Sequence, residues 1–452
     1  MKMNGQIEMT SGPLGGKIFK YALLLAATGI LQQLFNAADI AVVGQYCGTN
    51  AQAAVGANGP VIGLMVNFFV GISLGSNVVM ARLIGKKDAQ GVSRAVHSSV
   101  LVALAGGFLL LALGEIFAGK IVLALSVPSE ISGAAEKYLR IYFLGMPVIL
   151  LYNFEAAIFR STGDTRKPLA ALTISGVVNV ALNLFFVRAL GMDVDGVATA
   201  TAVSNLVSAT ILFVALLRAD SQIKITVKKL KFDAKILSEI LRIGVPSGVQ
   251  SMIFSFANII IQSAMNTLGA VVIAGSASAF NLEILSYYVI NSFGQACSTF
   301  VGQNFGAGKN ERCLSTLKIC LAQCAAAMAI SCSLILIFSR TLLAIFNRDS
   351  GVIEIGLIRL KFLFTGYIFS FAQEVLSGYL RGWGASLVPA LCAMAGICGV
   401  RLAWIFTVFQ KSRTFITIMT VYPISLAITA IAILLVTLIL RPSKRYSIKE
   451  IR

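Results

Sequence analysis

Twelve long stretches of apolar residues, separated by polar loops, make up most of this chain of 452 residues. Each stretch has about 20 residues or more, the length that a helix needs to cross roughly 30 Å of hydrocarbon. Only 12% of the residues are charged, about half the share found in soluble proteins. The stretches lie at 18–45, 53–83, 93–113, 137–159, 168–188, 195–217, 240–268, 272–304, 313–337, 356–380, 387–408 and 414–440. We therefore predict an all-α polytopic membrane protein with 12 transmembrane helices.

The second half of the chain repeats the first half at a constant distance of 221 residues. The matched pairs are Gly85 and Gly306, Gly145 and Gly366, Arg160 and Arg381, Gly163 and Gly384, and Pro168 and Pro389. Two halves with six spans each enter the membrane from the same side, so the repeat is parallel. We predict two pseudo-symmetric six-helix bundles, 1–230 with the start of a cytoplasmic linker and 231–452, with the substrate site at their seam.

Basic residues follow the loops in a regular way. The net charge is +18, and Lys and Arg gather mainly in alternate loops, including the polar linker at 218–235. Cytoplasmic loops of membrane proteins carry this excess. We therefore expect a multi-pass protein of the cell membrane with both termini in the cytoplasm. The same distribution argues against a nucleic-acid partner.

The residues that usually form metal sites or catalytic centres are scarce within the spans. The eight cysteines lie mostly inside apolar stretches and show no metal-ligand spacing. The single histidine, His97, begins the third span, where we expect it to be an interfacial residue without a role in transport. No cluster of His, Asp and Glu and no pair of catalytic carboxylates is evident. We expect no metal, no cofactor and no enzymatic activity.

Several motifs, taken together, resemble the multidrug and toxic compound extrusion (MATE) family of transporters, and they cover nearly the whole chain. The bacterial branch that includes DinF and MepA is more similar than the NorM type. The motifs are 39–44 in the first span, the glycine-rich loop 302–308, 160–168 and its repeat 381–389, the asparagines of 179–183, and 401–404. The resemblance implies transport by alternating access.

Asp39 is the first candidate for a functional residue. A carboxylate inside a membrane helix costs roughly 2.5–3.5 kcal/mol on insertion scales, so it normally faces a partner or water. In this region the offset between the repeats shifts by two residues, so that Asn258 lies opposite Asp39. The charge exists in one half only, which makes the two halves chemically unequal. The resemblance implies that Asp39 binds the coupling ion, H⁺ or Na⁺. A carboxylate paired for structural reasons is the alternative.

In members of this branch, polar residues of the fifth and sixth spans assist the acidic residue. The matching positions are Asn179, Asn183 and Thr201. The two asparagines are four residues apart and share a helix face. Helix packing is the alternative role for them. Many relatives have Asp in place of Asn183. With a single carboxylate the site has less charge, which weakens the case for Na⁺ binding and leaves proton coupling through Asp39 alone open.

The second half offers two further charged candidates, Glu283 and Arg401. We predict a substrate-binding role for both, although Glu283 can equally lie at the outer interface and Arg401 can be a structural anchor that needs an acceptor. Two other acids, Glu155 and Glu374, are expected to pair with the arginines that follow them, Arg160 and Arg381.

The predicted function is secondary active export of organic cations, including drugs, by antiport with H⁺ or Na⁺. The expected partners are a small organic cation and the lipid bilayer, and the protein is expected to be a monomer. The first alternative is a flippase for lipid-linked oligosaccharides, which would need several cationic groups to hold a pyrophosphate. The second alternative, from a different class, is a membrane channel, but no selectivity filter is recognisable.

Overall fold

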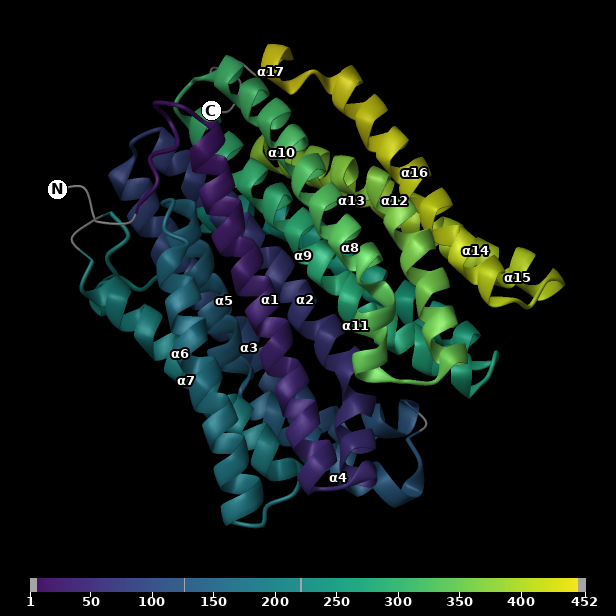
Figure 1. Ribbon diagram of the computed structural model, residues 1–452. Coiled ribbons are helices and arrows are strands. Elements are labelled where there is room, and N and C mark those ends of the chain that lie inside the picture. Colours follow the sequence, from purple (N-terminus) through teal and green to yellow (C-terminus); the bar gives the residue numbers. More distant parts are fainter. Residues whose placement is uncertain (1–5, 126, 220–221, 446–452) are drawn as a thin grey trace. The chain divides into compact units, whose positions relative to one another are not determined.

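The computed structural model describes residues 6–125, 127–219 and 222–445, and every regular element in these residues is a helix (Figure 1). The N-terminal half contains α1 (Gly15–Tyr46), α2 (Thr49–Gly85), α3 (Ala89–Ala124), α4 (Ser129–Leu144), α5 (Met146–Ser161), α6 (Arg166–Leu184), the π-helix η1 (Phe185–Ala189), α7 (Val194–Leu217) and the short η2 (Val227–Lys229). The C-terminal half contains α8 (Ala234–Asn266), α9 (Ala270–Gly306), α10 (Asn310–Ile337), α11 (Ser339–Phe346), α12 (Ser350–Gly382), α13 (Leu387–Ala393), the π-helix η3 (Met394–Gly399), α14 (Val400–Phe406), α15 (Val408–Lys411), α16 (Phe415–Leu440) and α17 (Pro442–Arg445).

The helices account for the predicted membrane spans. Within the described ranges, ten helical segments are long and apolar enough to cross a membrane singly, and α4 and α5 form one more as a pair bent by 48°. The bend coincides with Gly145 between the two helices and with Pro147, whose ring removes a backbone donor at the start of α5. The remaining predicted span lies in α12, which is 33 residues long and is interrupted by charged residues such as Arg359. The prediction of an all-α polytopic protein is confirmed.

The chain divides into two compact units. Among the described residues, one unit contains Gln6, Ile7 and 27–248, and the other contains 8–26 and 249–445. Both α1 and α8 therefore contribute residues to both units. The domain boundary at residue 230 stays a prediction, because the two units are defined by contacts between residues and not by the sequence repeat.

The same pairs of neighbouring helices recur in the two units. In the first unit α5 packs against α2, α3 and α7; in the second unit α12 packs against α9, α10 and α16. These are the matching spans of the repeat, so the internal symmetry of the sequence is also a symmetry of packing.

Glycines bring the first part of α8 close to α2 within the first unit. A side chain at Gly71 would overlap the backbone of Gly248, and one at Gly75 would overlap the backbone at Ile240 and Gly244. Small residues allow such close approach of helices in membranes, where packing and not the hydrophobic effect drives association. The contact explains why Ala234–Gly248 groups with the N-terminal helices.

Candidate functional site

The side chain of Asp39 is held by residues of α6 and α7 in the first unit. Asn183 Nδ2 donates to Asp39 Oδ1 at 2.5 Å, and Thr201 Oγ1 lies 3.2 Å from Asp39 Oδ2. Asn183 Nδ2 also donates to Asn179 Oδ1 at 3.3 Å. Both asparagines are buried, whereas Asp39 and Thr201 are partly exposed. The structure thus brings together all four residues that the sequence singled out for the coupling site.

Asp39 has no cationic partner in the part of the chain that the structure describes. None of the ion pairs among the described residues involves this carboxylate. Its neighbours are neutral amide and hydroxyl groups, which hydrogen-bond the carboxylate without compensating its charge. An intramembrane carboxylate in such surroundings is suited to take up a proton or a small cation from outside the protein.

Two of the surrounding groups could stabilise Asp39 after it has bound a proton or a cation. The Thr201 hydroxyl also lies 2.9 Å from the carbonyl oxygen of Val197, and a hydroxyl has only one hydrogen to donate. When that hydrogen goes to Val197, Thr201 Oγ1 can accept a hydrogen bond from a protonated Asp39. In addition, Asn183 Oδ1 is buried without a hydrogen-bond partner among the described residues. An oxygen of this kind could ligate a bound cation.

The helix geometry changes immediately after this site. Asn183 is followed within two residues by the π-helix η1, which widens the last turns of the span. In the second unit the π-helix η3 ends two residues before Arg401. Single π-helical turns often occur at functional sites, because the wider turn re-aims the side chains next to it.

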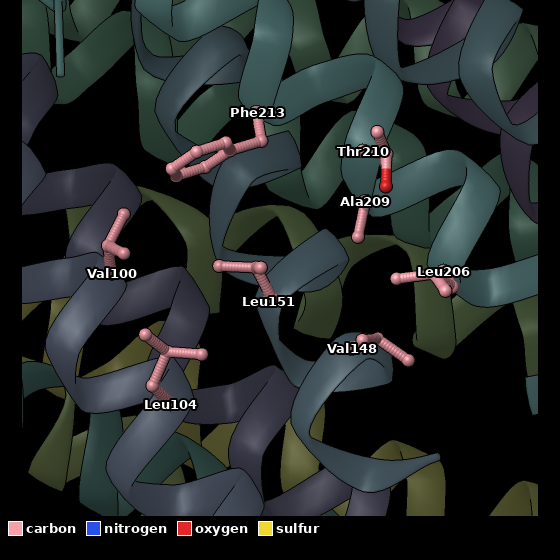
Figure 2. Close-up of a pocket in the computed structure, with 8 residues that line it drawn as sticks. All are labelled: Val100, Leu104, Val148, Leu151, Leu206, Ala209, Thr210 and Phe213. Atoms are coloured by element: carbon pink, nitrogen blue, oxygen red, sulfur yellow. The ribbon is translucent and has the colours of Figure 1, made fainter.

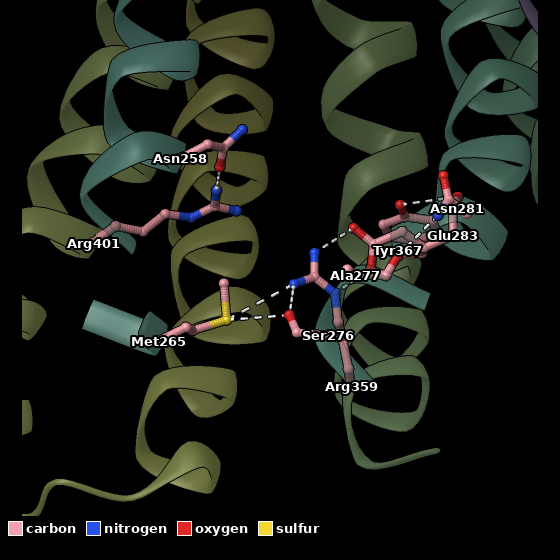
Figure 3. A network of polar contacts seen from close by, with 9 residues as sticks. All are labelled: Asn258, Met265, Ser276, Ala277, Asn281, Glu283, Arg359, Tyr367 and Arg401. Atoms are coloured by element: carbon pink, nitrogen blue, oxygen red, sulfur yellow. Dashed lines mark hydrogen bonds and ion pairs between the residues drawn. The ribbon is translucent and has the colours of Figure 1, made fainter. Parts of the chain in front are cut away.

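Glu283 of α9 forms a buried ion pair with Arg359 of α12 in the second unit (Figure 3). The pair is bidentate: Arg359 Nε lies 2.9 Å from Glu283 Oε2, and Arg359 NH2 lies 2.8 Å from Glu283 Oε1. Arg359 NH1 also donates to Ser276 Oγ. Both carboxylate oxygens are therefore engaged by a cation, and Glu283 is only 6% exposed. A substrate-binding role of Glu283 and its alternative, a position at the outer interface, both stay predictions.

Arg401 is buried in the same unit and contacts neutral groups. Its Nε donates to Ser425 Oγ at 3.1 Å, and its NH1 donates to Asn258 Oδ1 at 3.2 Å. The guanidinium also lies 4.4 Å from the ring centroid of Tyr422 and 5.4 Å from that of Phe254. Cation–π contacts of this kind stabilise a desolvated guanidinium. The acceptors that a buried Arg401 needs are thus an amide, a hydroxyl and two aromatic faces.

The two other acids differ in their partners. Glu374 pairs with Arg381 at 3.1 Å, as expected. The expected pair between Glu155 and Arg160 does not form: Glu155 is fully buried, and neither of its carboxyl oxygens has a hydrogen-bond partner among the described residues.

Two contacts were not predicted from the sequence. Arg359 was not foreseen as the partner of Glu283. His97 is only 3% exposed, and both of its ring nitrogens are within hydrogen-bond distance of backbone groups, contacts that the sequence did not indicate. Its expected place at the membrane interface stays a prediction.

The chain is similar in sequence and in fold to proteins of one known family. The family model MatE matches residues 25–185 and 246–407. The probable multidrug resistance protein YoeA of Bacillus subtilis is 26% identical over 430 residues, covering 92% of this chain and 91% of the relative. The probable multidrug resistance protein NorM of Thermotoga maritima is 27% identical over 399 residues, covering 87% and 85%. The fold matches the solved outward-facing structure of a multidrug resistance MATE transporter, with a TM-score of 0.91, 20% identity, and 99% and 100% of the two chains covered.

Proposed function

Because the chain belongs to the MatE family of multidrug transporters, we propose that it exports organic cations by secondary active antiport, with Asp39 as the residue that binds the coupling ion. The observation that carries this proposal is the hydrogen-bonded group of Asp39, Asn183 and Thr201, in which the carboxylate has no cationic partner among the described residues. The substrate site would be exposed alternately to the two sides of the membrane.

The proposed coupling rests on the charge of one side chain. An ion that enters from the outside neutralises Asp39 and removes the main electrostatic reason for an organic cation to stay bound. The ion-bound state therefore favours release of the substrate to the outside, which is the differential affinity that antiport requires. When the ion leaves to the cytoplasm, the carboxylate regains its charge and the site can accept the next substrate molecule.

We propose H⁺ as the coupling ion. The group contains a single carboxylate, and the Thr201 hydroxyl can accept a hydrogen bond from its protonated form. The buried oxygen of Asn183, which lacks a donor among the described residues, is the specific observation that supports Na⁺ as the alternative ion. Sodium prefers several oxygen ligands, which here would be Asp39 and the two asparagine carbonyls.

Arg401 supports a second candidate function. A buried guanidinium that contacts only neutral groups could hold an anionic group such as the pyrophosphate of a lipid-linked oligosaccharide. Because Arg401 is the one such residue that we identify in the described part of the chain, export of organic cations remains the leading proposal.

Reconstitution into proteoliposomes tests the proposal. The vesicles are loaded so that efflux of a fluorescent organic cation can be followed after a proton gradient, a Na⁺ gradient or no gradient is imposed, in the absence of ATP. We expect a proton gradient to accelerate efflux, and an ionophore that collapses the gradient to abolish the acceleration. Equal efflux with and without either gradient would refute antiport, and translocation of a pyrophosphate-linked lipid without cation efflux would favour the second candidate.

A further inference from the structure

The linker between α7 and α8 is attached to the first turns of α3 by specific hydrogen bonds within the first unit. The backbone N–H of Thr226 donates to His97 Nε2 at 3.1 Å, so the ring hydrogen is on Nδ1, which donates to the carbonyl oxygen of Ser93 at 2.6 Å. The backbone N–H of Asp233 donates to Ser98 Oγ at 3.1 Å. One ring nitrogen of the single histidine thus holds the linker, and the other fixes the ring to α3.

A cavity of about 350 Å³ lies between the linker and α3. Four basic residues line it: Arg94 of α3 and the linker residues Lys228, Lys229 and Lys231. Asp233 is its acidic residue, and its carboxylate pairs with Arg94 at 3.1 Å. The backbone N–H of Ile236 and the charge of Arg94 hold the pKa of Asp233 below its usual value. Asp233 is therefore ionised at neutral pH and offsets Arg94, which leaves the charges of the three lysines uncompensated in the cavity.

Apolar side chains accompany the lysines in this segment. Val227 is 61% exposed and Phe232 is 50% exposed, on either side of the three lysines. Exposed apolar residues that alternate with basic ones are typical of segments at the surface of a bilayer, where the apolar groups enter the lipid and the basic groups contact phosphates.

A second cavity, of about 210 Å³, begins on the same face of α3 (Figure 2). It is lined by Val100 and Leu104 of α3, by Leu151 of α5, and by Leu206 and Phe213 of α7, whose side chains point into it in Figure 2. Val100 and Leu104 lie on the same face of α3 as Ser93 and His97, because the four residues follow one another at steps of three or four. Val100 lies only about 4.5 Å along the helix axis from His97. Leu206 is 50% exposed, so this cavity is open to the surroundings of the helices.

We propose that the two cavities together bind one anionic phospholipid, with the phosphate in the basic cavity and part of an acyl chain in the apolar one. A soluble anion would leave the apolar cavity empty. A zwitterionic lipid would bring its positively charged group to a cavity where three lysines are not compensated by the other lining residues. This lipid site is separate from the proposed coupling site, and its function would be to fix the linker and the end of α3 to the bilayer.

Lipid binding by the purified full-length protein in detergent tests this proposal. Phosphatidylglycerol and phosphatidylcholine are titrated, and bound lipid is counted by native mass spectrometry. The variant Lys228→Gln/Lys229→Gln/Lys231→Gln is compared with the equally charged control Lys86→Gln/Lys87→Gln/Lys318→Gln, which changes exposed lysines of other loops and helices. Near a membrane each lysine contributes about fivefold to binding of an anionic lipid, so we expect the first variant to bind phosphatidylglycerol at least about tenfold more weakly. The control is expected to bind like the native protein.

A second pair of variants tests the apolar cavity. Thr210→Phe places a ring in the cavity, whereas Val203→Phe changes a partly exposed position of the same helix that does not line it. We expect only Thr210→Phe to weaken binding of both lipids. Inorganic phosphate serves as the competitor: displacement of phosphatidylglycerol by millimolar phosphate would assign the site to a free anion and overturn the proposal. Binding by the triple-lysine variant equal to that of the native protein, or equal losses in both triple variants, would also overturn it. None of these measurements involves transport, so their outcome is independent of the proposed antiport.

Discussion

The amide of Asn183 donates to the carboxylate of Asp39 at 2.5 Å, although the two residues lie 144 positions apart in the chain. This contact joins α1 to the end of α6 at the point where the helix changes to η1. It places a neutral donor, and not a cation, against the single carboxylate of the candidate site. No cation among the described residues neutralises Asp39, which is why we propose that an ion from outside the protein does so.

The equivalent position in the second unit has the opposite electrostatic character. Asn258 replaces Asp39 in the repeat, and it accepts a hydrogen bond from Arg401. The first unit thus holds an anion against a neutral amide, and the second unit holds a cation against a neutral amide. The repeat preserves the helix packing while the chemistry of the two halves has diverged, so we expect ion binding in the first unit alone.

Replacing Asn183 with Asp tests the identity of the coupling ion. The substitution Asn183→Asp adds a second carboxylate next to Asp39 and so provides more charged oxygen ligands for Na⁺. We expect the ratio of Na⁺-driven to H⁺-driven efflux to rise by about fivefold or more, which corresponds to a coupling free energy of about 1 kcal/mol. The neutral variant Asn183→Ala serves as the control and should show no rise in this ratio. An unchanged ratio in Asn183→Asp would contradict our account of ion choice.

The buried pair of Glu283 and Arg359 provides a stability prediction. Removing one partner leaves the other charge buried and unpaired, which typically costs about 3–5 kcal/mol. We expect Glu283→Leu to lower the apparent melting temperature clearly, and the double variant Glu283→Leu/Arg359→Met to recover most of the loss. Thermal unfolding in detergent checks this order. A double variant no more stable than the single one would argue against a compensated pair.

Replacement of Glu155 is predicted to raise the stability of the protein instead of lowering it. Its carboxyl group is buried without hydrogen bonds among the described residues, and such a group costs about 1–3 kcal/mol relative to an apolar group of similar shape. We expect Glu155→Leu to raise the apparent melting temperature, whereas Glu155→Gln, which keeps a buried polar group, should not. Destabilisation by Glu155→Leu would show that the carboxyl group has a favourable partner.

The close contact of α2 with α8 predicts different effects for two glycines of the same helix. A methyl group at Gly71 would overlap the backbone of Gly248, whereas one at Gly56 would meet open space. Gly56→Ala should be neutral or stabilise the protein by about 0.5–1 kcal/mol, because Ala favours the helix. Gly71→Ala should destabilise it by about 1–3 kcal/mol, the usual cost of overpacking. Comparable melting temperatures for the two variants would contradict the close contact of α2 with α8.

The grouping of Asp39 with Asn179, Asn183 and Thr201 was expected from the resemblance to the MATE family, and local patterns indicated only part of it. Asp39 is a lone acid in an apolar span, and Asn179 and Asn183 share a helix face by their spacing. The expected pair of Glu374 and Arg381 forms and that of Glu155 and Arg160 does not, for one physical reason. Residues seven apart return to nearly the same side of a helix, whereas residues five apart are separated by about 140° around it. Helical spacing alone therefore favoured only one of the two expected pairs.

The contacts that could not be predicted are long-range. Arg359 and Glu283 lie on different helices 76 positions apart, and no local pattern indicates that these two faces meet. His97 accepts a hydrogen bond from the backbone N–H of Thr226, 129 positions away. That contact depends on how the linker folds back onto α3. The two cavities on α3 likewise exist only once α5, α7 and the linker are in place.

Gradient-driven efflux by the Asp39→Asn variant tests the central claim most directly. The variant keeps a hydrogen-bonding side chain of the same shape but has no charge for the ion to neutralise. The control is Asp193→Asn, which changes an exposed acid of the loop before α7. We predict that Asp39→Asn loses the acceleration by an imposed proton or Na⁺ gradient, by about tenfold or more, while Asp193→Asn keeps it. Full gradient-driven efflux by Asp39→Asn would contradict the assignment of the coupling ion to Asp39.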